Sequence, residues 1–357
     1  MKRMQCTALA ALLVAAALPA AAQTIQTVST TVPANGDVNP YGIVVEPTTT
    51  GKLTQGHILI SNFNNSANAQ GTGTTLVDIS PEGALTLFAQ INPAALPGPG
   101  PGGVGLTTAL AVTESGWVIV GSLPTSDGTS ATAQAGCLIV LDKNGNPVET
   151  FYGTLINGPW DMIWTAGAPG QTILFVTNVL NGTVAANGTV VNAGTVVRIV
   201  LNQTATVMPS IESMTVVGSG FAQRTDPAAL VLGPTGVALS RSSSPVLYVA
   251  DTLNNRIAVI PNALTRTTSA GVGETLTSGG SLNAPLGLIT APDGDLVTVN
   301  GADGYGTLIS SSGTQIEKQL LDSSGSPAGA GALFGLVFDS NGLYYVDDAT
   351  NTLNLFN

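Results

Sequence analysis

Short apolar runs separated by turn residues follow one another along most of the chain. Ile173–Val176 and Val246–Ala250, for example, each hold four or five consecutive aliphatic or aromatic residues. Runs of this length, bounded by Gly, Pro, Asn or Asp, are typical of β-strands, whereas a helix needs a longer pattern with a period of 3.6 residues. Turn signals such as Pro-Asp-Gly at 292–294 separate neighbouring runs. The pattern predicts an all-β protein made of short antiparallel strands.

The same order of runs occurs six times. Each copy has a first apolar strand, a turn, and a second strand that ends in a polar residue. Equivalent positions in the six first strands, called opening positions below, are Gly42, Ala109, Asp161, Gly236, Gly287 and Gly335. They lie 48 to 75 residues apart, a spacing that fits four-stranded propeller blades with loops of different lengths. Six copies predict six blades around a central channel.

The two ends of the chain fit into one blade. The last repeat has three strands within residues 333–356, and Thr24–Val32 is a single β-rich segment ahead of the first repeat. Pairing this segment with the last repeat supplies a fourth strand and removes an open edge. We therefore expect residues 23–357 to form one six-bladed β-propeller whose N-terminal strand closes the last blade.

The clearest repeat lies in residues 233–260. It begins Gly-Pro-Thr-Gly-Val-Ala-Leu, and its second strand ends in Ala-Asp shortly before Asn-Asn-Arg-Ile. These residues resemble an NHL repeat, which implies a propeller used as a binding or scaffolding surface. Related propellers include the gluconolactonase-like enzymes, which hold a divalent cation in the channel with a Glu, an Asn and an Asp. Of that set the chain offers Asn178 and Asp251, whereas Glu46 lies at the far end of the first opening strand.

The charge balance narrows the choice of partner. Only 9% of the residues are charged, and the net charge is −11. Scarce Lys and Glu disfavour helical bundles. Nucleic-acid affinity comes mainly from Lys and Arg on phosphates, and no basic run suggests an acidic membrane surface. The balance favours a small neutral or cationic ligand, or a protein partner, over an anionic one, unless a divalent cation such as calcium intervenes.

Residues 1–22 have the pattern of a secretory signal peptide. Lys2 and Arg3 precede a twelve-residue apolar run, Thr7–Leu18, which is shorter than the roughly 20 residues of a membrane-spanning helix. We expect cleavage after Ala22 and a secreted or periplasmic, bacterial protein that is monomeric and has no membrane span. Cleavage leaves eight basic and 21 acidic side chains, a net charge of −13.

The chain is poor in side chains that commonly catalyse reactions. Its one histidine, His57, excludes a multi-histidine metal site, and we expect it to be exposed at the start of a second strand. Cys137, in the apolar run Gly136–Leu141, is predicted to be a buried, inert thiol. The sequence has no Gly-x-Ser-x-Gly motif and no phosphate-binding loop.

Polar residues end all six second strands. The set, taken at apparently equivalent positions, is Asn62, Ser122, Asn178, Asp251, Asn300 and Asp348. Asn and Asp commonly cap turns by accepting hydrogen bonds from nearby backbone N–H groups. Alternatively, some of them converge on the channel and hold a cation or a polar ligand. Asp161 adds a carboxylate at an opening position where other repeats have Gly, and its burial near the axis would need a partner or a cation.

Aromatic residues and long connections mark one face of the expected propeller. Three of the residues that precede the opening positions are aromatic, Tyr41, Trp160 and Phe334; they either pack between blades or stack on a ligand. Five connections of ten or more residues are expected around the same channel mouth: 64–73, 91–105, 123–136, 179–194 and 322–332.

Two functions remain open. The first is a non-enzymatic binding or interaction scaffold that uses the long-loop face. The second is a divalent-metal-dependent hydrolase or lyase, gluconolactonase-like, acting in the channel. The candidate ligand-binding residues are Tyr41, Asn62, Trp160, Asp161, Asn178, Asp251, Phe334 and Asp348.

Overall fold

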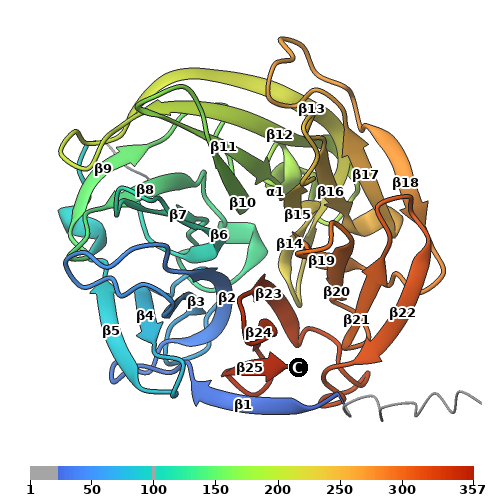
Figure 1. The fold of residues 1–357 in the computed structure, drawn as a ribbon, viewed down its shortest axis with the longest axis horizontal. Helices are drawn as coiled ribbons and strands as arrows, with labels where there is room; N and C mark the ends of the chain where they lie inside the picture. The colour runs from blue at the N-terminus through green and yellow to red at the C-terminus, as the bar shows by residue number, and fades with distance from the viewer. Residues whose placement is uncertain (1–22, 99–101) are drawn as a thin grey trace, which may run out of the picture.

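Strands arranged around a central axis dominate the computed structural model, which describes residues 23–98 and 102–357. They form six antiparallel sheets placed side by side in a ring (Figure 1). The prediction of an all-β, six-bladed β-propeller is therefore confirmed. The predicted signal peptide, residues 1–22, lies outside the described residues. Within the described ranges, no helix is long and apolar enough to cross a membrane.

Each blade is a meander whose first strand lines the channel. Blades one to three comprise β2–β5 (Val38–Val45, Ile58–Asn64, Thr75–Ile79, Leu85–Gln90), β6–β9 (Leu106–Val112, Val118–Ser122, Cys137–Leu141, Pro147–Phe151) and β10–β13 (Pro159–Ala166, Gln171–Asn178, Val191–Asn202, Ser210–Asp226). Blades four and five comprise β15–β18 (Pro234–Leu239, Leu247–Asp251, Arg256–Ile260, Glu274–Ser278) and β19–β22 (Pro285–Thr290, Leu296–Asn300, Tyr305–Ile309, Gln315–Leu320). The sixth blade comprises β23–β25 (Leu333–Phe338, Leu343–Asp347, Thr352–Phe356) and β1 (Ile25–Thr30).

The N-terminal strand closes the sixth blade, as predicted. β1 pairs antiparallel with β25, from Ile25 opposite Phe356 to Thr30 opposite Thr352. Figure 1 shows β1 running along the outside of the ring beside β25. The pairing gives the last blade its fourth strand and ties the start of the chain to its end.

Every inner strand bulges at its opening position. In β15, for example, the pairing with β16 shifts between Pro234 and Val237, and the other five inner strands shift at the equivalent place. A bulge releases backbone groups from the ladder and turns them aside. At Gly236 the released backbone lies so close to the Leu286 carbonyl of the next inner strand that a Cβ atom would clash with it. Glycine at this position therefore allows adjacent inner strands to approach one another.

Apolar side chains fill the spaces between adjacent blades. One cluster forms at each blade-to-blade interface, and the cluster between the sixth and first blades extends into the centre of the ring. Cys137, at the start of the third strand of blade two, is fully buried in one of these clusters. Burial raises the pKa of the Cys137 thiol to about 12. The prediction of a buried thiol on a third strand is confirmed.

Blade three carries an additional hairpin that the sequence patterns did not predict. β13 turns at residues 227–229 into a short fifth strand, β14 (Leu230–Leu232). Figure 1 shows β14 reaching toward the middle of the ring. Leu230 and Val231 are fully buried in the central apolar cluster. The hairpin therefore covers part of the channel with side chains from the outer edge of its own blade.

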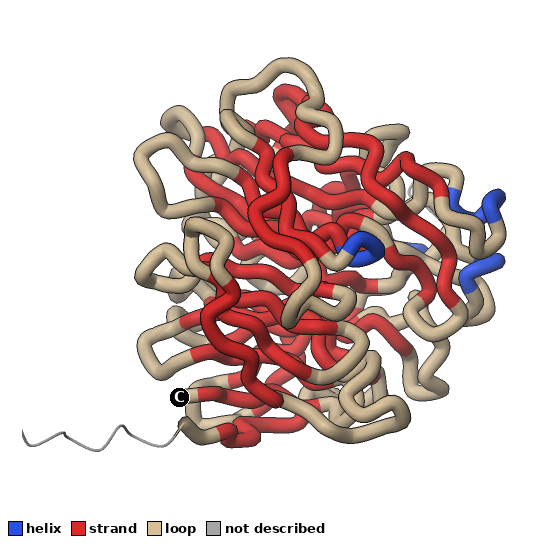
Figure 2. Tube along the Cα trace, turned by 90° about the vertical axis from the view of Figure 1, so that its right-hand side faces the viewer, coloured by secondary structure: helices blue, strands red, loops and turns tan. Residues whose placement is uncertain are grey.

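Four of the five predicted long connections lie where expected in the blade order, and the fifth, 91–105, lies partly outside the described residues. Residues 65–74, 123–136 and 179–190 join second to third strands, and residues 321–332 join two blades. β12 begins at Val191, so the third of these connections is shorter than predicted, and it contains the one-turn helix α1 (Thr183–Ala186). The short helical turns within these connections gather on one side of the molecule (Figure 2). We call this side the long-loop face.

Candidate functional site

A cavity of about 570 Å³ opens on the long-loop face. Its wall comes from the β3–β4 loop, the β13–β14 hairpin, the β22–β23 loop and the residues that follow β24. Tyr41, Leu286 and Phe334 form part of its lining from the inner strands. We call this space the mouth cavity.

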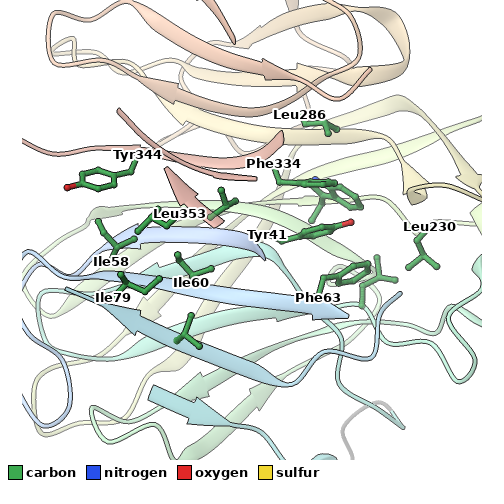
Figure 3. Close-up of a cluster of buried hydrophobic side chains, with 14 of the residues drawn as sticks. Tyr41, Ile58, Ile60, Phe63, Ile79, Leu230, Leu286, Phe334, Tyr344 and Leu353 are labelled. Atoms are coloured by element: carbon green, nitrogen blue, oxygen red, sulfur yellow. The ribbon is translucent and has the colours of Figure 1, made fainter. Parts of the chain in front are cut away.

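Aromatic rings close the channel beneath the mouth cavity. The ring centroid of Tyr41 lies 3.9 Å from that of Phe334 and 4.5 Å from that of Phe63, with the rings stacked. Figure 3 shows Tyr41 between these two rings. Trp160 lies 6.0 Å from Tyr41 in a tilted arrangement. We call these four side chains the aromatic plug. Each is at most 4% exposed, so nearly all of its surface is buried in packing contacts.

Two acidic groups that line the mouth cavity lie near each other without a protein partner in the described part of the chain. Neither the Tyr41 hydroxyl nor the Asp348 carboxyl forms a hydrogen bond there, although both residues line the cavity. Burial, with a smaller contribution from the Asp347 carboxylate, raises the pKa of Asp348 to about 8. Burial, followed by the nearby Asp348, also raises the pKa of Tyr41 well above its usual value. Both groups therefore hold their protons at pH 7 and can donate hydrogen bonds into the cavity.

Amide side chains at and after the end of β3 form another part of the wall. Asn64 is 1% exposed and donates from Nδ2 to the Asn68 side-chain oxygen over 2.7 Å. Its own Oδ1 atom is buried without a partner among the described residues. Gln70 donates from Nε2 to the Ala228 carbonyl over 2.7 Å, which fastens the β3–β4 loop to the β13–β14 hairpin. Two blades far apart in sequence thus share one wall of the cavity.

Strand pairing corrects the predicted ring of polar residues at one position. Leu333 pairs with Asp347 as Pro285 pairs with Asn300, so Asp347 is the sixth member of the ring. Asp348 comes one residue after β24 and lines the mouth cavity instead. Two adjacent aspartates made the repeat ambiguous in sequence, and the register of β23 with β24 decides between them.

Three other ring members bond the segments that lead into the first strand of their own blade. Asn178 Oδ1 accepts from the Asn157 backbone N–H over 2.9 Å, and Asn300 Oδ1 accepts from that of Asn283 over 3.0 Å. Asn62 donates from Nδ2 to the Thr31 carbonyl over 3.1 Å. These bonds hold the segments that lead to neighbouring strands. The two bonds from backbone N–H groups match the turn-capping interpretation, whereas Asn62 donates and its own Oδ1 is buried without a partner among the described residues.

The gluconolactonase-like set of metal ligands is not assembled in this chain. Asp251 is fully buried and forms an ion pair with Arg256 over 2.8 Å, while Asn178 bonds its own blade. Glu46 is fully buried at the far end of β2, where it accepts from the Thr54 N–H. No three His, Cys, Asp or Glu side chains gather as a possible metal site in residues 23–98 and 102–357. The donors present therefore do not fit the cation site that the resemblance implied.

Asp161 lies below the aromatic plug, away from the mouth cavity. Its Oδ1 accepts from the Met162 N–H over 2.8 Å, and its Oδ2 accepts from the Val237 N–H of the next inner strand over 3.1 Å. Burial raises the pKa of Asp161 to about 7 even though these two bonds lower it. The predicted grouping of Asp161 with Tyr41, Phe334 and Asp348 at the mouth is thus divided by the plug. We expected a buried Asp161 to need a partner or a cation. The backbone N–H groups of two bulged strands, β10 and β15, are its partners.

His57 is less exposed than expected. It precedes β3, and its Nδ1 lies 2.9 Å from the Asp78 carboxylate on β4. Its side chain is 24% exposed. The pairing with Asp78 across the two strands explains why the imidazole lies against the sheet rather than projecting into solvent.

Two sequence comparisons find no match for this chain. No protein-family model matches it, and a search of curated proteins finds no similar sequence. The NHL resemblance thus rests on the residues of the 233–260 repeat alone.

Solved structures share its fold. A gluconolactonase from Xanthomonas campestris aligns with 94% of this chain and 89% of its own, at 13% identity and a TM-score of 0.57. An aldose sugar dehydrogenase from Streptomyces coelicolor aligns with 95% of this chain and 100% of its own, at 14% identity and a TM-score of 0.54. A virginiamycin B lyase from Staphylococcus aureus aligns with 94% of this chain and 99% of its own, at 15% identity and a TM-score of 0.51. At these identities the likeness defines the class of fold, a six-bladed propeller like that of gluconolactonase.

Proposed function

We propose that the protein is an extracytoplasmic, NHL-type propeller that binds a small neutral or cationic organic ligand in its mouth cavity. The observation that carries the proposal is the pair of unpartnered groups, the Tyr41 hydroxyl and the Asp348 carboxyl, beside an aromatic floor in a cavity of about 570 Å³. Small-molecule sites commonly combine an apolar, aromatic lining with a few polar groups that orient the ligand.

The lining suggests how such a ligand would be held. An apolar or aromatic part would lie against Phe334 and Leu286, and a hydrogen-bonding end would reach Asp348 and Asn64 Oδ1. Because Asp348 keeps its proton up to about pH 8 in the free protein, a cationic ligand would favour the ionised carboxylate and release that proton on binding.

Matched probes test this proposal. We expect 2-phenylethylamine to bind more tightly than 2-phenylethanol, and phenylacetate to bind least, in titration calorimetry at pH 8. Asp348→Asn should weaken amine binding at least about tenfold, since a charge-assisted hydrogen bond contributes about 1.5–3 kcal/mol. Asp293→Asn, at an exposed turn between β19 and β20, is the control and should leave binding unchanged. Equal affinity for all three probes, or an unchanged Asp348→Asn variant, would contradict the proposal.

A hydrolase or lyase acting in the same cavity is the second candidate. Two observations favour it: gluconolactonase and virginiamycin B lyase share the fold, and Asp348 is a carboxyl of raised pKa that faces a cavity, as general acids do. A divalent-metal mechanism has less support, because the ligands that the resemblance implied, Asp251, Asn178 and Glu46, bond other protein groups. Turnover of a lactone such as glucono-1,5-lactone, lost in Asp348→Asn and retained after EDTA treatment, would favour this candidate over binding alone.

The location is proposed from the N-terminal sequence. A positive start, an apolar run and a small-residue site in residues 1–22 support export and cleavage. Mass spectrometry of the protein from a bacterial periplasmic extract should then find a chain that begins at Gln23. An intact Met1 in that fraction would contradict cleavage.

A further inference from the structure

A second cavity occupies the channel on the other side of the aromatic plug. It has a volume of about 120 Å³ and is lined by residues from all six inner strands. It shares Ile163, Ile289 and Val337, among others, with a wider space of about 440 Å³ that opens near the β15–β16 turn. We call the two together the lower channel. It opens on the face opposite the long loops.

The inner part of the lower channel, the 120 Å³ cavity, is lined by apolar residues apart from Asp161 and Thr108. The wider outer space adds the polar residues Thr165, Ser240, Arg241 and Thr290. Each Asp161 oxygen receives one backbone N–H, which leaves further lone pairs on both oxygens. Thr108 is 7% exposed, and its hydroxyl is buried without any partner among the described residues. A buried hydroxyl that forms no hydrogen bond is uncommon, because losing its bonds to water costs free energy.

The charge of the inner end of the lower channel indicates which ligand group would bind there. No cationic side chain in the described residues pairs with Asp161. Asp161 is the one titratable residue lining the 120 Å³ cavity from any of the six strands, and Arg241 lies only at the outer opening. A carboxylate in an apolar site is stabilised by a cation with hydrogen-bond donors. An ammonium group has three such donors, enough for both Asp161 oxygens and the Thr108 hydroxyl.

We propose that the lower channel binds a primary alkylammonium ion, with its head group on Asp161 and Thr108 and its alkyl chain along Ile163, Ile289 and Val337. The apolar wall suits an alkyl chain, and the inner polar pair suits the ammonium group. The site shares no lining residue with the mouth cavity, so this inference stands independently of the function proposed above.

Three probes of equal chain length test the head-group preference. In titration calorimetry with the full mature chain, n-hexylamine should bind at least tenfold more tightly than 1-hexanol, and hexanoate should show no binding. Hexylamine affinity should also rise with pH through about 7, because Asp161 must lose its proton to pair with the ammonium. Hexanol binding should not change with pH. Equal affinities for the amine and the alcohol would show that the channel selects only for the apolar chain, and this result would overturn the proposal.

Variants locate the binding. Thr108→Val keeps the shape of the side chain and removes a hydroxyl that bonds nothing in the protein, so the melting temperature should not fall, while hexylamine affinity should drop several-fold. Ile289→Trp, at a partly exposed position, should block the channel and abolish hexylamine binding there. Asp348→Asn, which removes the carboxylate of the mouth cavity, should leave the binding in the lower channel unchanged. Unchanged hexylamine affinity in both Thr108→Val and Ile289→Trp would overturn the assignment, even if Asp161→Asn proves too unstable to purify.

Discussion

The two ends of the channel differ in the elements that build them. Loops and a hairpin contribute most of the mouth cavity, and its lining includes Asn, Gln and Asp side chains. Inner strands build the lower channel, and only Asp161 and Thr108 interrupt its apolar inner end. Loops have no pleat or pairing register to satisfy, so they can present polar groups where a strand must pack on both neighbours. The aromatic plug keeps the two environments apart.

The carboxyls on either side of the plug illustrate this difference. Burial raises the pKa of both Asp161 and Asp348. Asp161, on a strand, accepts two backbone N–H groups and joins blade three to blade four. Asp348, after a strand, has no such bonds in the described chain. The Asp161 carboxyl is therefore bonded into the framework and keeps only its remaining lone pairs for a ligand, whereas the Asp348 carboxyl is wholly available to one.

Both cavities depend on a closed ring, so opening the ring should have the largest effect. Deleting residues 24–32 removes β1 and its pairing with β25, together with the Thr31 carbonyl that Asn62 contacts. We expect the free energy of unfolding to fall by about 4 kcal/mol or more. Urea denaturation followed by circular dichroism measures it. A deletion variant as stable as the mature chain would contradict the role of β1.

Removing one ring from the plug should join the two cavities. Phe334 is 4% exposed and stacks on Tyr41, so Phe334→Ala should cost about 3–5 kcal/mol. Tyr41→Phe is the matched control and should cost less than about 1 kcal/mol, because it keeps the ring and removes a hydroxyl without a protein partner. Similar losses in the two variants would argue against a packed plug.

Alanine substitution of each aspartate tests the difference between the two carboxyls. Asp161→Ala leaves the Val237 and Met162 N–H groups without acceptors, which should cost about 1–3 kcal/mol. Asp348→Ala removes a partly buried carboxyl that bonds nothing in the protein and should be neutral or stabilising. Chemical denaturation of both variants at pH 7 measures their free energies of unfolding and tests this expectation. Equal destabilisation would show that the two carboxyls play the same part.

The pH dependence of stability follows from the same two groups. Their folded-state pKa values, about 7 for Asp161 and about 8 for Asp348, exceed the usual value of 3.8. Between about pH 4 and 8 the folded state thus binds more protons than the unfolded state, and stability falls as pH rises through that range. The double variant Asp161→Asn/Asp348→Asn should reduce the slope. Glu46, whose pKa burial raises to about 8, should account for part of the remainder. An unchanged slope would contradict the pKa assignment.

A change outside both cavities tests the packing between blades without touching either site. Cys137 is fully buried between blades one and two, and Cys137→Ser should cost about 1–2 kcal/mol by burying a hydroxyl in place of a thiol. It should leave ligand binding in either cavity unchanged. Fast labelling of the native thiol by a maleimide would contradict its burial.

Local patterns in the sequence determined the ring of blades. Apolar runs of strand length, turn residues between them and six copies of one order were enough to predict the six-bladed fold, the closing strand and the burial of Cys137. These features depend on neighbours a few residues apart or on a repeat, so their signal is contained within short segments. The β13–β14 hairpin departs from the repeat, and the periodic pattern therefore missed it.

Only the tertiary structure decided what meets at the channel. Tyr41, Phe63, Trp160 and Phe334 come from three blades, and ring closure brings their side chains together at the axis. Gln70 contacts Ala228 across 158 residues of sequence. Strand register placed Asp347 in the polar ring and Asp348 in the mouth cavity, and the bulge in β10 placed Trp160 in the plug and Asp161 below it. Such positions depend on the pairing of strands and the packing of distant blades, which no short segment of the chain records.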